Sequence, residues 1–219
     1  MDIASNIKDV KSRIERAAAR AGRNPGDITL IVVTKYAEEP AILAAAGAGI
    51  SHFGENRVQD AERKILRLSE CELRPTWHMI GHLQRNKVQT ALKIFDIIHS
   101  IDSVRLAQAI SAQAEKAVPV LLQVNVAEEE TKGGFEKDEL SGAVAEISRL
   151  PNLSIKGLMT IAPLVDNPEE VRPVFRELRK LHDTFGMEHL SMGMSNDFEI
   201  AVEEGATMLR LGRIIFSER

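Results

Sequence analysis

A lysine follows the most apolar segment in the first part of the chain, where residues 28–35 read ITLIVVTK. A lysine at the end of a buried strand is partly removed from water, and desolvation disfavours its charged ammonium. A nearby Arg210 would disfavour that charge further. Both effects favour a nucleophilic amine at Lys35, which forms imines with aldehydes. The alternative is a lysine whose stem covers apolar surface while its head reaches water, and the strand alone does not separate the two.

Two glycine-containing segments near the end of the chain contain suitable parts for a phosphate site. Gly193 and Gly212 permit close approach of a ligand to the backbone, and Ser195 offers a hydroxyl at the start of the predicted helix SNDFEIAVEEG. Arg213 adds positive charge. Either segment alone is a weak signal, because a glycine commonly ends a strand for structural reasons.

Other arrangements that could do chemistry are disfavoured by their spacing. His78 and His82 are four residues apart, but a strand pattern interrupts the helix that would direct both at one metal ion, and no HExxH sequence is present. His99, Ser100 and Asp102 are the residue types of a hydrolase triad, yet neighbours in one strand point to opposite faces. We therefore expect neither a metal site nor this triad.

No second base beside Lys35 is evident in the sequence. Tyr36 is the only tyrosine, and it faces away from Lys35 if the strand continues through it. A catalyst built on Lys35 would then need a base from elsewhere, such as His82.

The elements that must position these residues are short apolar segments that alternate with amphipathic stretches. The segments span residues 28–34, 50–54, 76–81, 95–101, 118–126, 155–161, 188–193 and 207–212. Strand and helix in alternation predict parallel strands joined by crossover helices. Eight units in 219 residues leave about 27 residues each, near the lower end for a (β/α)₈ barrel. We predict this TIM-type barrel, rather than an open sheet, as a single domain over residues 1–219.

Two helices are predicted with particular clarity. An extra N-terminal helix is indicated by apolar residues at steps of three and four, which are Ile3, Ile7, Val10, Ile14 and Ala18. A later helix is predicted to open at Asn167-Pro168-Glu169-Glu170, with a capping residue, a proline at its first position and two acids in its first turn.

Ligand sites on such a barrel lie where the strands end, so the residues after each apolar segment carry most of the functional information. These residues are polar at all eight segments, for example Lys35, Asn56 and His82. A single polar strand end is explained by contact with solvent. Eight together favour a binding site at this face.

Composition limits the classes of function. The formal net charge of -4 and the pI near 5.9 disfavour binding to nucleic acid or to anionic membranes. Cys71 is the only cysteine, which excludes an internal disulfide and suits a reducing compartment. The sequence contains neither a signal peptide pattern nor the ~20 consecutive apolar residues of a spanning helix. We expect a soluble cytoplasmic protein.

Several long motifs together resemble the pyridoxal-phosphate homeostasis protein family, also called YggS-like or PROSC-like. The resemblance covers nearly the whole chain. Its motifs are VVTK (32–35), HFGENRVQD (52–60), WHMIGHLQRNK (77–87), HSIDS (99–103), QVNVAEEETKGGF (123–135), GLMTI (157–161) and LSMGMSNDFEIAVEEGATMLRLGRIIF (190–216).

The resemblance implies a fold-type-III barrel similar to the N-terminal domain of alanine racemases, with pyridoxal 5'-phosphate (PLP) held through a Schiff base on Lys35. Asn56 and His82 would line the cavity, and Met159 would pack near the ring. Arg210 would face the pyridine nitrogen. The full set of cofactor-binding residues implied in this way is Lys35, Asn56, His82, Met159, Ser195, Asn196, Arg210, Gly212 and Arg213.

Arg210 in that position has a chemical consequence. Arginine stays protonated and can only donate hydrogen bonds, so it would leave the pyridine nitrogen unprotonated and the ring a weaker electron sink. The site therefore does not favour strong carbanion chemistry.

Two residues depart from the family pattern. Arg213 stands where many members have a small hydroxyl residue, so that it would either bind the phosphate from outside or point to solvent. Ser217 replaces a common glycine after the last phenylalanine, and we expect little effect on the cofactor.

The first functional hypothesis is a PLP-binding protein that holds the cofactor on Lys35 and takes part in its supply to PLP-dependent client enzymes, without robust catalysis. The alternatives are a racemase-like PLP enzyme and a cofactor-free Schiff-base aldolase. A monomer is expected, because the dimer contacts of the racemases involve their second domain. A second lysine such as Lys132 could also take the cofactor during transfer.

Overall fold

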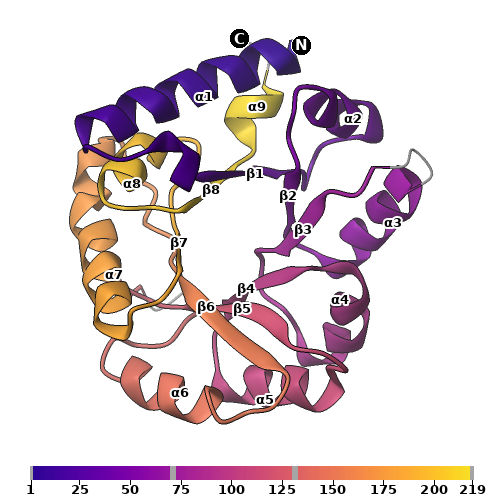
Figure 1. The fold of residues 1–219 in the computed structure, drawn as a ribbon, viewed down its shortest axis with the longest axis vertical. Helices are drawn as coiled ribbons and strands as arrows, with labels where there is room; N and C mark the ends of the chain where they lie inside the picture. Colours follow the sequence, from indigo (N-terminus) through magenta and orange to yellow (C-terminus); the bar gives the residue numbers. More distant parts are fainter. Residues whose placement is uncertain (1, 70–72, 130–132, 218–219) are drawn as a thin grey trace.

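Eight parallel strands form a closed barrel in which each strand pairs with the next along the chain and β8 pairs with β1 (Figure 1). This computed structural model describes residues 2–69, 73–129 and 133–217. The strands are β1 (Thr29–Val33), β2 (His52–Glu55), β3 (Thr76–Met79), β4 (Ile97–Ile101), β5 (Val118–Gln123), β6 (Leu153–Met159), β7 (His189–Ser191) and β8 (Met208–Leu211).

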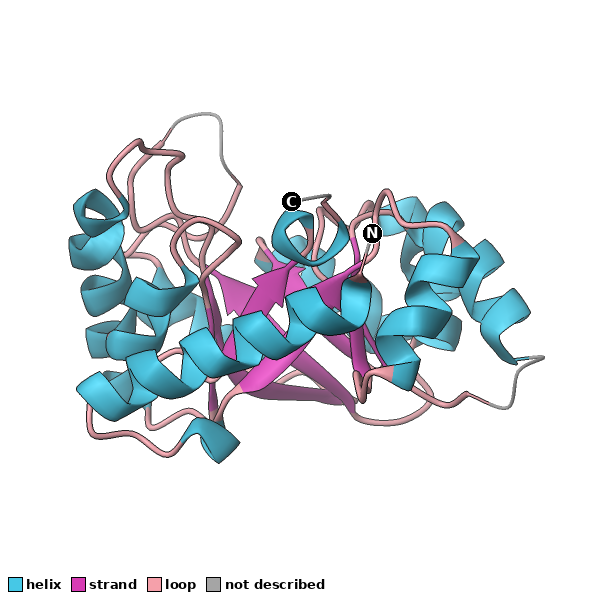
Figure 2. Ribbon diagram, turned by 90° about the horizontal axis from the view of Figure 1, so that it is seen from above, coloured by secondary structure: helices cyan, strands magenta, loops and turns pink. Residues whose placement is uncertain are grey.

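The predicted barrel is confirmed, and each of the eight apolar segments overlaps a strand, although β2 ends one residue later and β6 begins two residues earlier than its segment. Closure is seen in the pairing of β1 with β8, whose register runs from Thr29 opposite Met208 to Val32 opposite Leu211. All strands point the same way, so their carboxyl ends meet at one face of the barrel (Figure 2). That face is where the sequence places the candidate site.

Helices surround the barrel. They are α1 (Ile3–Arg20), α2 (Glu39–Gly47), α3 (Val58–Ser69), α4 (Val88–Ile94), α5 (Val104–Gln113), α6 (Leu140–Ile147), α7 (Arg172–Phe185), α8 (Phe198–Glu203) and α9 (Arg213–Phe216). Short 3₁₀ turns occur at Pro25–Asp27, Arg85–Lys87 and Pro168–Val171. No helix among the described residues is long and apolar enough to cross a membrane.

The extra N-terminal helix α1 lies across the outside of the strands and contacts the last two helices, α8 and α9 (Figure 2). All five residues of its predicted apolar stripe are buried. Arg13 of α1 makes a two-pronged ion pair with Glu199 of α8, and the Asn6 amide donates to the Ile215 carbonyl of α9 over 3.0 Å. Because α9 begins directly after β8, α1 helps to fix the backbone at the binding face.

The helix predicted to open at Asn167 begins differently from the expectation. The Asn167 side chain does cap a turn by accepting from the Glu169 N–H, but the turn at Pro168–Val171 is a 3₁₀ helix. The regular helix α7 starts only at Arg172. Tight 3₁₀ turns are frequent at helix ends, which sequence patterns locate only to within a few residues.

The barrel interior combines an apolar cluster with a row of polar side chains. Ile31, Leu121 and Met208 belong to the cluster. On the other strands, His78 and His99 are completely buried, with 2.9 Å between His78 Nδ1 and His99 Nε2. Burial lowers the pKa of His78 from 6.5 to about 3, and it also lowers that of His99, beside the positive charge of Arg210. Both imidazoles are therefore neutral at pH 7.

These two histidines predict that the protein loses stability in mild acid. In the unfolded chain both protonate as the pH falls below 6.5, whereas in the folded chain they stay neutral. Each proton taken up only by the unfolded state lowers the free energy of unfolding by about 1.4 kcal/mol per pH unit. Urea unfolding at pH 7 and pH 5 should show a loss of roughly 3 kcal/mol or more from the pair. A free energy of unfolding that is unchanged or higher at pH 5 would contradict this burial.

Candidate functional site

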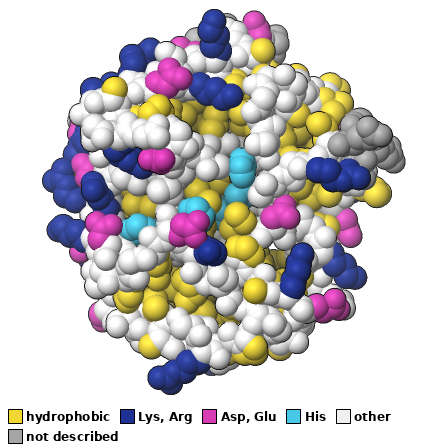
Figure 3. All heavy atoms as spheres, viewed as in Figure 1, with side chains coloured by type: hydrophobic (Ala, Val, Ile, Leu, Met, Phe, Trp, Pro, Cys, Tyr) yellow, Lys and Arg dark blue, Asp and Glu magenta, His cyan; other side chains and the backbone are white. Residues whose placement is uncertain are grey.

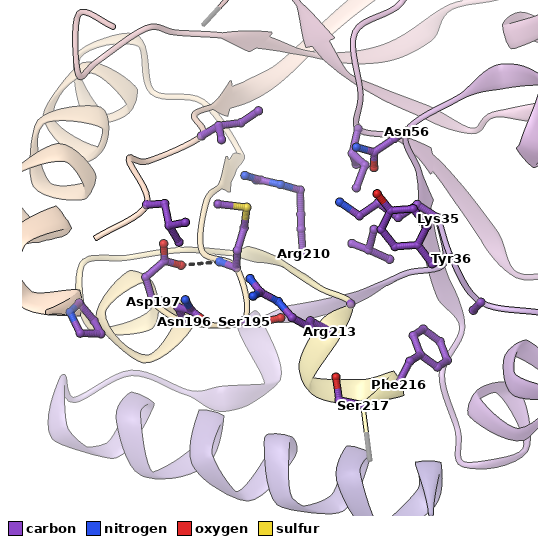
Figure 4. A pocket seen from close by; sticks show the side chains of 18 of the residues that line it. Lys35, Tyr36, Asn56, Ser195, Asn196, Asp197, Arg210, Arg213, Phe216 and Ser217 are labelled. Carbon is purple, nitrogen blue, oxygen red and sulfur yellow. Dashed lines mark hydrogen bonds between the residues drawn. The ribbon is translucent and has the colours of Figure 1, made fainter. Parts of the chain in front are cut away.

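A cavity of about 550 Å³ opens at the carboxyl ends of the strands (Figure 4). Its volume is within the range of pockets that bind small molecules. It brings together seven of the nine residues singled out from the sequence, although they come from both ends of the chain. These seven are Lys35, Asn56, Ser195, Asn196, Arg210, Gly212 and Arg213.

Lys35 lies two residues beyond β1 and lines the cavity together with Tyr36. The Lys35 ammonium is 5.1 Å from the centre of the Tyr36 ring, a cation–π contact. The condition under which Tyr36 would face away from Lys35 is not met, because β1 ends at Val33 and side chains no longer alternate beyond it. Lys35 is also exposed rather than partly buried, so the expected desolvation of its amine is absent in this structure.

The backbone just before Lys35 is held by an ion pair that the sequence pattern did not indicate. Lys64 of α3 donates to the carbonyl of Thr34 over 2.5 Å and pairs with Glu55 over 2.6 Å. The Thr34 hydroxyl donates to the same Glu55 oxygen over 2.6 Å. Glu55 is completely buried. Three hydrogen bonds thus fix the peptide that leads into Lys35.

The opposite part of the cavity presents backbone donors. The backbone N–H groups of Ser195, Asn196, Gly212 and Arg213 make no hydrogen bond within the described part of the chain. The Ser195 hydroxyl accepts from the N–H of Ile214 over 3.3 Å, which ties the two segments together. Free N–H groups from two loops, at the seventh and eighth strand ends, are the usual means of binding a phosphate on this barrel.

Gly212 allows the backbone to pass close to β1 at this point. A Cβ atom at residue 212 would lie 3.0 Å from the Val33 carbonyl oxygen and 3.2 Å from the Val33 Cβ. Any larger residue would have to move the loop that carries the free N–H groups. This packing against Val33 is a structural reason for glycine at residue 212, and the approach of a ligand to its backbone stays a prediction.

Asp197 is a buried acid at the cavity that the sequence pattern did not single out. Its Oδ1 accepts from the backbone N–H of Met194 over 2.5 Å, which closes the turn that carries Ser195 and Asn196 (Figure 4). Burial raises the pKa of Asp197, and the Met194 N–H and the charge of Arg210 oppose that rise. An acid that reaches back to the N–H three residues before it is half of a capping box, and the spacing of Met194 and Asp197 in MSND is a signal for that contact.

Arg210 reaches the cavity from the barrel interior and is only 5% exposed. Its Nη1 donates to the Ser191 hydroxyl over 2.6 Å, and its Nη2 donates to the Thr160 carbonyl over 2.7 Å. Burial lowers the pKa of Arg210 to about 10, which still leaves it protonated at pH 7. Arg210 is therefore a fixed cation that can donate but not accept a hydrogen bond at this site.

Two of the residues singled out from the sequence do not line this cavity. Met159 is completely buried in the interior cluster with Ile31 and Leu121. His82 lines a separate polar pocket beside Arg57, has a 70% exposed side chain, and lies with its Nδ1 2.9 Å from Asp102 Oδ2. Their predicted contact with the cofactor is therefore not supported by the geometry. Lys132 lies outside the described residues.

The remaining expectations concern metal and hydrolase chemistry. The three residues of the disfavoured triad have separate partners: His99 contacts Ser191, Ser100 donates to the Gly81 carbonyl, and Asp102 contacts His82. The described part of the chain also contains no group of three or more metal-ligating side chains.

The residues that line the cavity fit PLP at three of its functional groups. An amine is available for the aldehyde, free backbone N–H groups for the phosphate, and a fixed cationic donor for the pyridine nitrogen. In addition, Asn56 Oδ1 is buried in the wall without a hydrogen-bond partner among the described residues. A buried acceptor of this kind calls for a donor from a bound molecule or water.

Comparisons with known proteins give the same assignment. Residues 5–219 match the family described as alanine racemase, N-terminal domain. A curated relative from Aquifex aeolicus, named pyridoxal phosphate homeostasis protein, is 42% identical and covers 100% of this chain and 99% of its own length.

Solved structures share this fold. PipY from Synechococcus elongatus, solved with PLP bound, is 35% identical with a TM-score of 0.82, and the match covers 94% of this chain and 100% of PipY. Alanine racemase from Corynebacterium glutamicum has a TM-score of 0.74 at 16% identity, over 100% of this chain and 61% of the racemase. The racemase match shows a common fold.

Proposed function

This chain belongs to the family of pyridoxal phosphate homeostasis proteins, and we propose that it holds PLP through a Schiff base on Lys35 and supplies it within the cell without robust turnover. The observation that carries the proposal is one cavity that joins an accessible amine, four free backbone N–H groups and a buried cation. The structure of PipY with PLP bound supports PLP as the ligand of this chain as well.

Lys35 is suited to capture an aldehyde. An amine that condenses with an aldehyde releases water and forms an imine, and the hydrogen bonds of Glu55 and Lys64 to Thr34 fix the backbone from which the Lys35 side chain extends. The exposed position of Lys35 keeps the amine within reach of solvent. Such a site supports reversible capture and release of a free aldehyde, which a supply role requires.

The phosphate should contribute much of the affinity. Four free N–H groups line the cavity near Ser195 and Arg213, and a hydrogen bond to a charged group contributes about 1.5–3 kcal/mol. With at least two such bonds, pyridoxal without its phosphate should bind roughly 100-fold more weakly than PLP. Absorbance titrations of the purified protein with both compounds measure this ratio. Equal affinities would show that the loops around Ser195 do not hold the phosphate.

Arg210 limits the chemistry at this site. Bound PLP supplies an electron sink, and its strength depends on protonation of the pyridine nitrogen. The Arg210 guanidinium has no acceptor atom and is held by Ser191 and Thr160. It therefore cannot accept a hydrogen bond from a protonated pyridine nitrogen, so it favours an unprotonated ring, and with it binding over carbanion chemistry.

A racemase-like enzyme is the second candidate, favoured by the position of Tyr36 next to Lys35. A phenol beside Lys35 offers a second acid–base group, which was not evident from the sequence. His82, the base considered from the sequence, lines a different pocket. If turnover occurs, it should depend on Tyr36.

Proton exchange separates the two candidates. The PLP-loaded protein is incubated in deuterated water with a panel of amino acids, and exchange of their α-protons is followed by NMR. We expect one PLP bound per chain and exchange no faster than with free PLP. Rapid exchange that is lost in Tyr36→Phe would establish the enzyme instead, and Lys93→Ala, on the exposed face of α4, serves as a matched control.

The cellular context follows from the same hypothesis. We propose that the protein is a cytoplasmic monomer that delivers PLP to PLP-dependent client enzymes and binds neither nucleic acid nor membranes. The formal net charge of -4 supports the last of these points, because a negative chain does not attract nucleic acid or anionic membranes.

A further inference from the structure

Hydrogen bonds extend from Arg210 through the barrel to its opposite face. Arg210 Nη1 donates to Ser191 Oγ, which lies 2.9 Å from His99 Nδ1. His99 Nε2 is 2.9 Å from His78 Nδ1. His78 Nε2 is in turn 3.0 Å from His52 Nδ1. We call Ser191, His99, His78 and His52 the histidine column.

The column ends where the strands begin. His52 is the first residue of β2, is partly exposed and lines a cavity of about 450 Å³ at that face. Figure 3 views the molecule from this side and shows histidine side chains near its centre. The column therefore connects the cofactor cavity, through Arg210, with the far side of the barrel.

The chemistry of Arg210 sets the direction of every hydrogen bond in the column. A guanidinium only donates, so Ser191 Oγ must accept from it. If Ser191 Oγ used its second lone pair to accept from His99 as well, the hydroxyl hydrogen would have no partner among the described residues. The hydroxyl therefore donates to His99 Nδ1, which is the unprotonated acceptor. His99 consequently carries its proton on Nε2 and donates it to His78 Nδ1.

The same logic continues to the surface. His78 accepts at Nδ1, so it carries its proton on Nε2 and donates to His52 Nδ1. All three imidazoles are thus neutral Nε2–H tautomers, and each turns an unprotonated nitrogen toward Arg210. If His78 were protonated, both of its ring nitrogens would carry hydrogens, and at one of its two contacts an N–H group would face another N–H group.

The charges around the column agree with neutral rings. Burial is the first cause that lowers the pKa of His78, His99 and His52. Other charged groups act on individual members. His189 lowers the pKa of His78 and of His99, and Arg210 also lowers that of His99. Asp96 raises the pKa of His52, and Asp197 raises that of Arg210.

We propose that the histidine column positions Arg210: its aligned acceptor nitrogens stabilise the buried guanidinium and fix it as a donor toward the cavity. Aligned hydrogen bonds polarise one another and strengthen the contact at the charged end. The column touches no cofactor, so its members are positioning residues and not catalytic ones. This inference deepens the proposed function and rests on it only for the identity of the ligand.

Nitrogen NMR of the full chain tests the direction of the column. With ¹⁵N-labelled histidine, His99 and His78 should each show a protonated Nε2 and an unprotonated Nδ1 at pH 7, with or without added PLP. Neither should titrate between pH 8 and pH 5. A protonated Nδ1 at His99, or an imidazolium at either ring, overturns the proposal whether or not the protein binds PLP.

Variants test whether the Arg210 end or the His52 end of the column sets the direction of its hydrogen bonds. Ser191→Ala removes the acceptor of Arg210 and the donor to His99, so His99 should lose its single tautomer and the affinity for PLP should fall about tenfold. Ser191→Thr retains a hydroxyl and should restore both properties to within about twofold. Unchanged His99 resonances in a folded Ser191→Ala protein would overturn the proposal.

A variant at the exposed end keeps the proposal testable if Ser191→Ala does not fold. His52→Gln leaves Arg210 and Ser191 intact, so the tautomers of His99 and His78 should not change. If His52→Gln reverses either tautomer, the direction is set from the surface and Arg210 does not control the column. Ser148→Ala, at the exposed end of α6, is the matched control for Ser191→Ala.

Discussion

Replacing Lys35 by alanine should abolish covalent retention of PLP. The cavity would keep its phosphate donors and Arg210, but it would contain no amine to bind the aldehyde. We expect Lys35→Ala to retain no cofactor after dialysis, whereas the wild-type chain retains about one per molecule. Residual binding through the phosphate should be reversible and weaker by about 100-fold or more.

The measurement compares absorbance after dialysis and the mass of the intact protein after reduction with borohydride. Lys93→Ala removes an exposed lysine from α4 and should behave as wild type. Unfolding curves of both variants should coincide with wild type, because neither lysine is a buried partner of other groups. A Lys35→Ala protein that still gains the mass of reduced PLP would place the cofactor on another lysine, such as Lys132.

Replacing Gly157 by alanine should disrupt the barrel itself. Gly157 pairs with His189 across β6 and β7, and a Cβ atom there would lie 1.8 Å from the His189 carbonyl oxygen and 2.7 Å from Leu121 Cδ2. Backbone atoms in a closed sheet cannot move apart without breaking the pairing. Overpacking of a well-packed core typically costs about 1–3 kcal/mol, and we expect this substitution to reach or exceed the upper value.

Gly142→Ala provides the matched control for that substitution. Gly142 lies within helix α6, and a Cβ atom there meets nothing within 4 Å. Alanine favours a helix over glycine by about 0.5–1 kcal/mol, so this variant should be slightly stabilised. Urea unfolding of both variants gives the comparison. A Gly157→Ala protein as stable as wild type would contradict the close pairing of β6 and β7.

The fold could be predicted because it depends on local patterns. The longer strands, such as β1 and β5, lie in short apolar runs, and α1 shows the helical period of its buried face. The position of the site followed from the barrel, since ligand sites lie at the carboxyl ends of the strands. Lys35 and Arg210 could therefore be assigned to one cavity although 175 residues separate them.

The direction of a side chain could not be predicted where the exact end of a strand decides it. The strand pattern puts Tyr36 on the far face only if β1 continues through it, but the strand ends at Val33. Met159, which the family resemblance implies near the ring, is the last residue of β6 and packs with Ile31 and Leu121 in the barrel interior. A shift of one residue reverses the face of a strand residue, and sequence patterns do not locate strand ends that closely.

Contacts between distant elements could not be predicted from one sequence. The ion pair of Glu55 with Lys64 depends on how α3 packs on β2, and the histidine column depends on the arrangement of four strands, β2, β3, β4 and β7. His78 and His99 were considered only for metal or triad chemistry, in which spacing along the chain matters. Their actual relation is across neighbouring strands, and only the closed barrel shows it.

The assignment of PLP to Lys35 is tested most directly on the unmodified protein. The absorbance spectrum is recorded before and after reduction with borohydride, and the reduced protein is then digested and its peptides are weighed. We predict a visible absorbance band that disappears on reduction, with the added mass on the peptide that contains Lys35. No band after addition of PLP, or the added mass on a different residue, would contradict the assignment.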